Sequence, residues 1–402
     1  MRVIINGAGI AGPTLAYWLL RHGHEPTLVE RAPKLRTGGY VIDFWGTGYD
    51  VAERMRLIPE LDRTGYHVKE LRLVDCDGRR AGGMSVEVFR QITEGRYLSL
   101  PRGDLAAAIH RHLDGRVETI FGDSIEAIEE TAGGVDVRLE SGAERSFDLA
   151  VGADGLHSRV RGIAFGPQET FEHRLGYTVA AFRALRYRPR DELVYVSYTT
   201  PGRQVARFAL HDDHTLFLFV YADGGADAPD PHDVAAHKAR LHEKFDAAGW
   251  ECPEILGAMD TAEDFYADRV SQIRMPHWSK GRVVLTGDAA FCPSLLAGQG
   301  SALAMTAAYV LAGEIDRAGG DHAAALNSYE AMLRPFLSAK QAAAEKFAGA
   351  FAPRTAFGVL LRNKVTSLMG LPFVARLVMG GTLVDQFALP DYADVSNDYA
   401  DA

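Results

Sequence analysis

The chain has 402 residues, of which 47% are hydrophobic and 24% charged, and its formal net charge is −10. This composition excludes a disordered or fibrous chain, and the acidic excess gives no electrostatic reason to expect nucleic acid or an anionic membrane as a partner. The length predicts one composite domain or two domains that share a core. Three cysteines lack metal or disulfide spacing, and we find no targeting segment and no membrane span, so we expect a cytoplasmic protein with reduced thiols.

The beginning of the chain has the pattern of a βαβ unit. A β-branched run at residues 2–6 precedes a glycine-rich turn and a helical pattern that starts near Pro13, and a second strand ends at Glu30. This order predicts parallel strands. Patterns of antiparallel strands, with Asp-Gly and Gly-Gly turns, follow around residues 66–88 and again over residues 177–275. Helices and buried strands lie between and after them, so the two architectures are interleaved.

The glycine-rich turn matches G-x-G-x-x-G. The first glycine permits the sharp turn, the second lets a pyrophosphate approach the backbone, and the third lets helix and strand pack closely. The helix N-terminus would then hold a diphosphate, and an acid at the tip of the second strand would accept hydrogen bonds from ribose hydroxyls. The predicted dinucleotide contacts are Gly7, Gly9, Ala11, Gly12, Glu30 and Arg31. By themselves they do not distinguish NAD from FAD.

A second stretch favours FAD. Asp288 follows the buried run RVVLTG at the end of a predicted strand, where its carboxylate can accept hydrogen bonds from a polyol such as the ribityl chain of FAD. Gly298, Gln299 and Gly300 then begin a long alanine-rich helix. The amides and dipole of its N-terminus suit the edge of a flavin that becomes anionic on reduction. An ordinary strand–loop–helix connection is the alternative interpretation.

Together with Gly152-Ala153-Asp154-Gly155, these motifs in this order resemble the class A flavoprotein monooxygenases of the para-hydroxybenzoate hydroxylase fold. That group includes tetracycline-inactivating and polyketide-tailoring enzymes. The resemblance covers about residues 1 to 350. It implies that Asp154 lies near FAD and the nicotinamide cofactor, and that Arg102, which opens a helix in Pro-Arg-Gly-Asp-Leu, contacts the flavin. Phe291 stands where the family commonly has a histidine.

The resemblance also implies the domain organisation. We expect an α/β fold in which a Rossmann-like FAD-binding domain with a parallel sheet is interleaved with an antiparallel-sheet substrate domain, followed by C-terminal helices. The FAD-binding domain would comprise residues 1–75, 98–175 and 276–350, and the substrate domain residues 76–97 and 176–275. Residues 351–402 would form a C-terminal helical segment. Either a monomer or a homodimer is expected.

The resemblance implies an FAD-dependent monooxygenase. NAD(P)H would reduce FAD as a transient co-substrate, O2 would form a flavin C4a-hydroperoxide, and one oxygen atom would hydroxylate an aromatic or polycyclic small molecule. A same-fold FAD reductase, a Baeyer–Villiger-type oxygenase and a non-catalytic flavin-binding protein remain alternatives. The sequence contains one G-x-G-x-x-G, which argues against flavoproteins with two nucleotide domains, and no W-x-W-x-I-P stretch, which disfavours a halogenase.

The loop at residues 38–48 is the candidate contact with FAD or substrate, through Asp43, Phe44 and Trp45. The alternative is a structural role, in which these side chains pack between a helix and the sheet. No catalytic base can be named from the sequence. We expect no metal site. The His-Asp-Asp-His run at residues 211–214 is typical of a solvated hairpin turn, and the sequence offers no further ligands for it.

Overall fold

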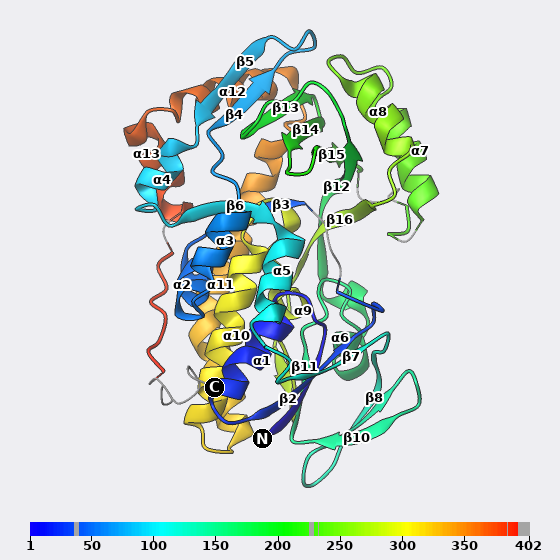
Figure 1. Cartoon of the computed structure of the whole chain (residues 1–402), viewed down its shortest axis with the longest axis vertical. Coiled ribbons are helices and arrows are strands. Elements are labelled where there is room, and N and C mark those ends of the chain that lie inside the picture. Colours follow the sequence, from blue (N-terminus) through cyan, green and yellow to red (C-terminus); the bar gives the residue numbers. More distant parts are fainter. Residues whose placement is uncertain (36–39, 225–228, 232, 384, 393–402) are drawn as a thin grey trace.

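The protein is described by a computed structural model for residues 1–35, 40–224, 229–231, 233–383 and 385–392 (Figure 1). Its first sheet contains six strands in the order β17-β18-β11-β1-β2-β7, all parallel except the β17–β18 pair. The strands are β1 (Arg2–Asn6), β2 (Glu25–Glu30), β7 (Glu118–Phe121), β11 (Leu149–Gly152), β17 (Ser279–Lys280) and β18 (Val283–Leu285). The predicted βαβ unit is confirmed: α1 (Ala11–Arg21) joins β1 to β2.

The second sheet contains seven strands in the order β16-β12-β15-β14-β13-β4-β5 and lies at the other end of the molecule (Figure 1). Neighbours are antiparallel except β13 and β4, which pair in parallel. Its strands are β4 (Glu70–Val74), β5 (Arg80–Ser85), β12 (Glu172–Leu185), β13 (Val194–Thr200), β14 (Arg203–Ala209), β15 (His214–Ala222) and β16 (Phe265–Ile273). The helices α7 (Val234–Phe245) and α8 (Cys252–Asp260) pack on its outer face. Thus the predicted interleaving of parallel and antiparallel architectures is confirmed.

Two small antiparallel sheets and several helices complete the body. One sheet pairs β3 (Val41–Trp45) with β6 (Tyr97–Pro101), and the other contains β8 (Ile125–Glu130), β9 (Val135–Leu139) and β10 (Glu144–Phe147). The helices α10 (Gly300–Arg317) and α11 (His322–Phe351) pack against each other, and α10 also packs on α1. The remaining helices of the body are α2 (Thr47–Arg54), α3 (Ile58–Thr64), α4 (Glu87–Ile92), α5 (Arg102–Arg111), α6 (Arg159–Ala164) and α9 (Asp288–Phe291).

Two sequence-based boundaries differ from the structure. The strand β4 belongs to the seven-stranded sheet, so the chain enters that sheet at Glu70, whereas the sequence places the boundary after residue 75. The segment expected as a loop at residues 38–48 contains the strand β3 and the start of α2, while residues 38 and 39 lie outside the described residues. The run Val-Ile-Asp-Phe-Trp alternates between half-buried and buried positions, which is the period of a strand.

The end of the chain is only partly helical. The helices α12 (Ala356–Leu368) and α13 (Pro372–Leu383) pack on β5 and α4, whereas residues 385–392 have no regular structure. Asp385 accepts hydrogen bonds from the amide and hydroxyl of Thr47, 2.8 and 3.1 Å away, and pairs with Lys340. The Tyr392 hydroxyl donates to Glu314 on α10. The last described residues therefore fasten α2 to α10 and α11.

Within the described ranges, no helix is both long enough and apolar enough to cross a membrane.

Candidate functional site: a dinucleotide cradle and an aromatic wall

The turn between β1 and α1 leaves one glycine open and packs the other two tightly. Gly7 has φ +111°, and a Cβ there would lie 2.5 Å from the carbonyl oxygen of Ala153. A Cβ on Gly12 would lie 1.9 Å from the carbonyl oxygen of Gly7. At Gly9 the nearest atom to such a Cβ is Nη2 of Arg102, at 3.8 Å. The backbone at Gly9 is therefore the part of the turn that a ligand can approach.

Arg102 supplies an available cation at this opening. It is the first residue of α5, after β6, and its guanidinium forms no hydrogen bond or salt bridge with any residue that the structure describes. Its positive charge acts on Asp288. A partly buried guanidinium without an anionic partner, next to an open glycine backbone, fits a diphosphate, which would accept hydrogen bonds from both.

Glu30 stabilises the turn from the tip of β2. Its carboxylate accepts hydrogen bonds from the amides of Ala8 and Ala32, each 2.9 Å away. Two amides hold the carboxylate in place and leave lone pairs for ribose hydroxyls. Arg31 beside it is exposed.

The chain from β18 to α10 brings the second predicted stretch next to the first. A Cβ on Gly287 would lie 3.1 Å from the Cβ of Ala11 at the start of α1. The carboxylate of Asp288 faces the start of α10, since its Oδ1 is 3.6 Å from where a Cβ on Gly300 would be. Burial raises the pKa of Asp288, and the charge of Arg102 opposes that shift. Residues separated by most of the chain thus line one continuous site.

Gly298 and Gln299 form the turn before α10. Gly298 has φ +67°, a left-handed conformation that suits glycine, and a Cβ there would lie 3.9 Å from Cη2 of Trp45. The indole Nε1 of Trp45 is buried without a hydrogen-bond partner among the described residues. A buried donor without a partner is costly, so this atom is suited to meet an acceptor on a bound group.

Asp154 lies at the end of β11, beside Gly7, and its carboxylate has a structural role. It accepts hydrogen bonds from the side-chain amide of Asn6 at 2.9 Å, the hydroxyl of Ser158 and the amide of Arg159 at 2.8 Å. These contacts join the end of β1 to the start of α6. Arg161, fully buried, donates to the carbonyl of Ala289 next to Asp288. Arg159 and Arg161, which closely follow the Gly-Ala-Asp-Gly stretch, are the signal in the sequence from which this support could have been found.

The strand β3 presents two of its three candidate residues to the site. Asp43 accepts hydrogen bonds from the hydroxyls of Tyr97 and Ser99, both 2.6 Å away, and burial raises its pKa. Phe44 points the opposite way and is fully buried in the core around the six-stranded sheet. The prediction that Phe44 contacts substrate is therefore wrong, because alternate residues of a strand point to opposite faces.

An aromatic wall joins β3 and β6 to the seven-stranded sheet. The rings of Tyr195 and Phe208 are 4.4 Å apart, and Tyr66 packs edge-on against Phe208 at 5.2 Å. Sequence reasoning missed most of this wall, because the hairpins that carry it are far apart in the chain. Its aromatic members are Tyr40, Trp45, Tyr66, Tyr97, Tyr195 and Phe208.

A group of polar side chains connects the loop after Asp154 to β16. His157, three residues after Asp154, contacts Asp268 through Nε2 at 2.8 Å, and this partner raises the pKa of His157. The hydroxyl of Tyr266 donates to the same carboxylate at 3.4 Å, and its ring lies 6.4 Å from that of Tyr40. Burial raises the pKa of Tyr40 to about 12.

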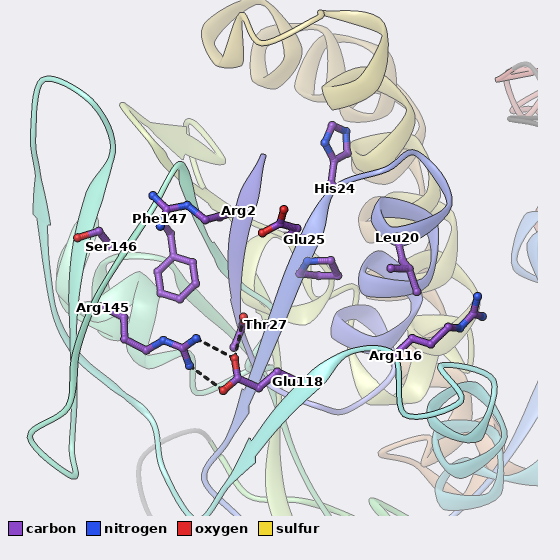
Figure 2. Close-up of a pocket in the computed structure, with 11 residues that line it drawn as sticks. Arg2, Leu20, His24, Glu25, Thr27, Arg116, Glu118, Arg145, Ser146 and Phe147 are labelled. Carbon is purple, nitrogen blue, oxygen red and sulfur yellow. Dashed lines mark hydrogen bonds and ion pairs between the residues drawn. The ribbon is translucent and has the colours of Figure 1, made fainter. Parts of the chain in front are cut away.

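The other candidate sites carry no comparable chemistry. In the described part of the chain, no group of three His, Cys, Asp or Glu residues could hold a metal ion. A pocket of about 520 Å³ lies near the beginning of β1 and β2, where Arg145 pairs with Glu118 (Figure 2). The glycine turn follows the other end of β1, so this pocket is separate from the cradle.

Parallel strands and an open glycine turn with Arg102 beside it are features of a dinucleotide-binding fold, and the relatives of this chain identify it as an FAD-dependent monooxygenase. The chain belongs to the family described as FAD binding domain, which it matches over residues 1–343. A flavin-dependent monooxygenase of Legionella longbeachae is 33% identical over 354 residues, covering 85% of this chain and 87% of the relative. An uncharacterized protein of Mycobacterium tuberculosis is 37% identical over 356 residues, covering 84% and 91%.

Solved structures agree. The tetracycline destructase Tet(55) has a TM-score of 0.82 and 30% identity, covering 97% of this chain and 98% of that structure. HpxO of Klebsiella pneumoniae, solved with FAD and uric acid, has a TM-score of 0.77 over 95% of this chain and 96% of its own, but at 23% identity it shows the fold alone. The predictions of an FAD-dependent aromatic hydroxylase family and of its α/β fold are confirmed.

Proposed function

We propose that this monooxygenase hydroxylates an aromatic or polycyclic small molecule, with NAD(P)H as the reductant and O2 as the oxidant. The dinucleotide would be held by the residues expected from the sequence. Its diphosphate would lie between Gly9 and Arg102, its ribose at Glu30, and its ribityl chain at Asp288. The flavin edge would face Gln299 and the start of α10.

The cofactor arrangement rests on the chemistry of these groups. Gly9 is the one glycine of the motif at which an added Cβ would meet no atom closer than 3.8 Å, and that atom is Nη2 of Arg102, which brings a cation to the opening. Asp288 sits at the carboxyl end of the parallel sheet, where such sheets present ligands. When bound, FAD would supply the oxygen-transfer chemistry, and the protein would supply position, water exclusion and electrostatics.

The substrate would lie against the aromatic wall. Tyr195 and Trp45 are half-buried and offer apolar ring faces, with the fully buried Phe208 packed behind Tyr195. Trp45 extends from the wall to Gly298, next to the expected flavin edge. Flat aromatic molecules gain from stacking and from burial of their surface, and the same rings exclude water. A polar end is provided by Asp43, Tyr97 and Ser99.

The position of Asp43 is the main support for this proposal. Its carboxylate lies among aromatic rings, and no cation pairs with it in the described residues. Burial raises its pKa, so it holds a proton more readily than an exposed carboxyl group. A substrate hydroxyl that bonds to Tyr97 could pass its proton through Tyr97 to Asp43. This would make a phenolic ring more electron-rich for oxygen transfer.

NAD(P)H would bind transiently. The sequence has one dinucleotide motif, and that motif is assigned to FAD. His157 and Arg159 lie just after Asp154, where Asp268 raises the pKa of His157 and the Arg159 guanidinium pairs with Glu140. They are our candidates for contacts with a second anionic cofactor, which would compete with these carboxylates.

The experiment is a screen of phenols and polycyclic compounds for substrate-stimulated NAD(P)H oxidation by the FAD-loaded protein, with O2 uptake and hydroxylated product measured together. Coupled consumption with product supports the proposal. NAD(P)H oxidation that forms reduced product without O2 would mean a reductase, and an inserted ring oxygen would mean a Baeyer–Villiger oxygenase.

Asp43→Asn tests the polar end. It should keep FAD and lose most of the stimulated turnover, by about 10²- to 10⁴-fold, as expected for a proton-accepting group. Asp136→Asn is the matched control, because Asp136 also accepts a hydrogen bond from a serine hydroxyl, that of Ser146, but lies on β9 in the small three-stranded sheet. Equal loss in both variants, or none in Asp43→Asn, would contradict the assigned role.

A further inference from the structure

The helix α12 is built with its polar side inward. Asn363 and Thr366 are buried, at 8% and 9% exposure, against the body of the protein. Phe357, Leu360 and Leu361 point outward, at 74%, 62% and 51% exposure. A surface helix of a water-soluble protein has the opposite arrangement, because burial of apolar groups is what holds it in place. This orientation indicates that another apolar surface covers α12.

The exposed apolar side continues along the turn and into α13. Seven of the ten large hydrophobic side chains that the structure describes as exposed lie between residues 357 and 377. We call this set the C-terminal apolar face. Its members are Phe357, Leu360, Leu361, Leu368, Leu371, Phe373 and Leu377. Concentration of most exposed hydrophobic residues in two neighbouring helices is typical of a binding surface.

The charge of this region is opposite to that of the rest of the chain. The chain has 53 acidic and 43 basic residues, but residues 346–384 contain no Asp or Glu. The same segment contains five basic residues, Lys346, Arg354, Arg362, Lys364 and Arg376. Of these, Lys346, Arg354, Lys364 and Arg376 are exposed. The net charge of the whole chain conceals this basic end.

We propose that the C-terminal apolar face lies on an anionic lipid bilayer. Apolar side chains interspersed with cations, without acids, are complementary to acyl chains beneath anionic headgroups. A symmetric contact between two copies would bring the same basic segment of each chain together, which costs electrostatic free energy. Because neither helix is long and apolar enough to cross a bilayer, they would lie in its surface.

This inference is independent of the proposed substrate. The face is built from α12 and α13, which pack on β5 and α4, whereas the cofactor cradle is formed by β1, α1, α5 and α10. The acidic remainder of the chain would turn away from an anionic membrane, so the same charge distribution both attracts the face and orients the protein.

The test is cosedimentation of the FAD-loaded full chain with vesicles of phosphatidylcholine alone, or containing about a third phosphatidylserine. We expect binding to the anionic vesicles and little to the neutral ones. Phe357→Ser with Phe373→Ser should weaken binding about a hundredfold, since two large apolar groups are lost. Lys364→Gln with Arg376→Gln should weaken it about 25-fold, about fivefold for each cation.

Leu185→Ser is the matched control, because Leu185 is 56% exposed at the end of β12 and outside the face. FAD content and the unfolding midpoint should be unchanged in all three variants, since the altered side chains are exposed. Absence of vesicle binding by the unaltered protein would overturn the proposal. So would a dimer that dissociates in the Phe357→Ser, Phe373→Ser variant without any vesicle binding, or equal loss in Leu185→Ser.

Discussion

Gly9 and Gly12 offer a test in which one added methyl group separates cofactor binding from folding. Gly9 does not have a positive φ, and the nearest atom to an added Cβ is 3.8 Å away, which is ordinary contact. Gly9→Ala should therefore leave the apoprotein as stable as the unaltered one, or up to about 1 kcal/mol more stable, since alanine restricts the unfolded chain. The methyl group would instead occupy the approach of the diphosphate.

Displacing the diphosphate from the turn would cost at least one charge-assisted hydrogen bond, about 1.5–3 kcal/mol, which is about a 10- to 150-fold weaker affinity for FAD. The assay is titration of deflavinated protein with FAD, followed by flavin fluorescence, with urea unfolding of the apoprotein in parallel. If Gly9→Ala folds normally and binds FAD with unaltered affinity, the diphosphate does not lie at this turn.

Gly12→Ala is the contrasting variant. Its Cβ would come 1.9 Å from the carbonyl oxygen of Gly7, far inside contact distance, and that oxygen belongs to the backbone. The turn or α1 must shift, so the apoprotein should lose about 3 kcal/mol or more of unfolding free energy. A stable Gly12→Ala apoprotein would show that the turn is looser than described.

Three further changes test other parts of the molecule. Asp288→Ala should weaken FAD binding about 10- to 100-fold in the same titration, and unaltered affinity would contradict a contact with the ribityl chain. Because burial raises the pKa of Asp43, ionisation opposes folding at pH values above its ordinary value of 3.8, so Asp43→Asn should raise the unfolding free energy at neutral pH. That gain should disappear below the ordinary value, and a gain that is the same at every pH would refute its electrostatic origin. Asp385→Ala removes the hydrogen-bond acceptor at the start of α2 and the ion pair with Lys340. Urea unfolding should show that the unfolding free energy falls by about 2–4 kcal/mol. Asp391→Ala, in the same terminal segment, should leave the unfolding free energy unchanged.

The elements with strong local signals could be predicted from the sequence. The sequence predicts the βαβ unit, the antiparallel hairpins and the family correctly. This is because the spacing of hydrophobic residues, the positions of glycines and the acids at strand ends can be read from short stretches of sequence. The position of Gly9 in an open turn also follows from the motif. By contrast, the sequence predicts a loop where β3 forms, because a five-residue strand between glycines gives little periodicity.

The tertiary structure alone decided how distant segments meet. Asp43 meets Tyr97 and Ser99 because β3 pairs with β6, and Phe44 joins the core because of the same pairing. Arg102 reaches Gly9 only because α5 is positioned beside the β1–α1 turn. The outward apolar side of α12 also required the structure, since a helical pattern reveals two unlike sides but not which one faces the body. Local sequence sets the conformation of each element, whereas side-chain contacts across the chain depend on the packing of all elements together.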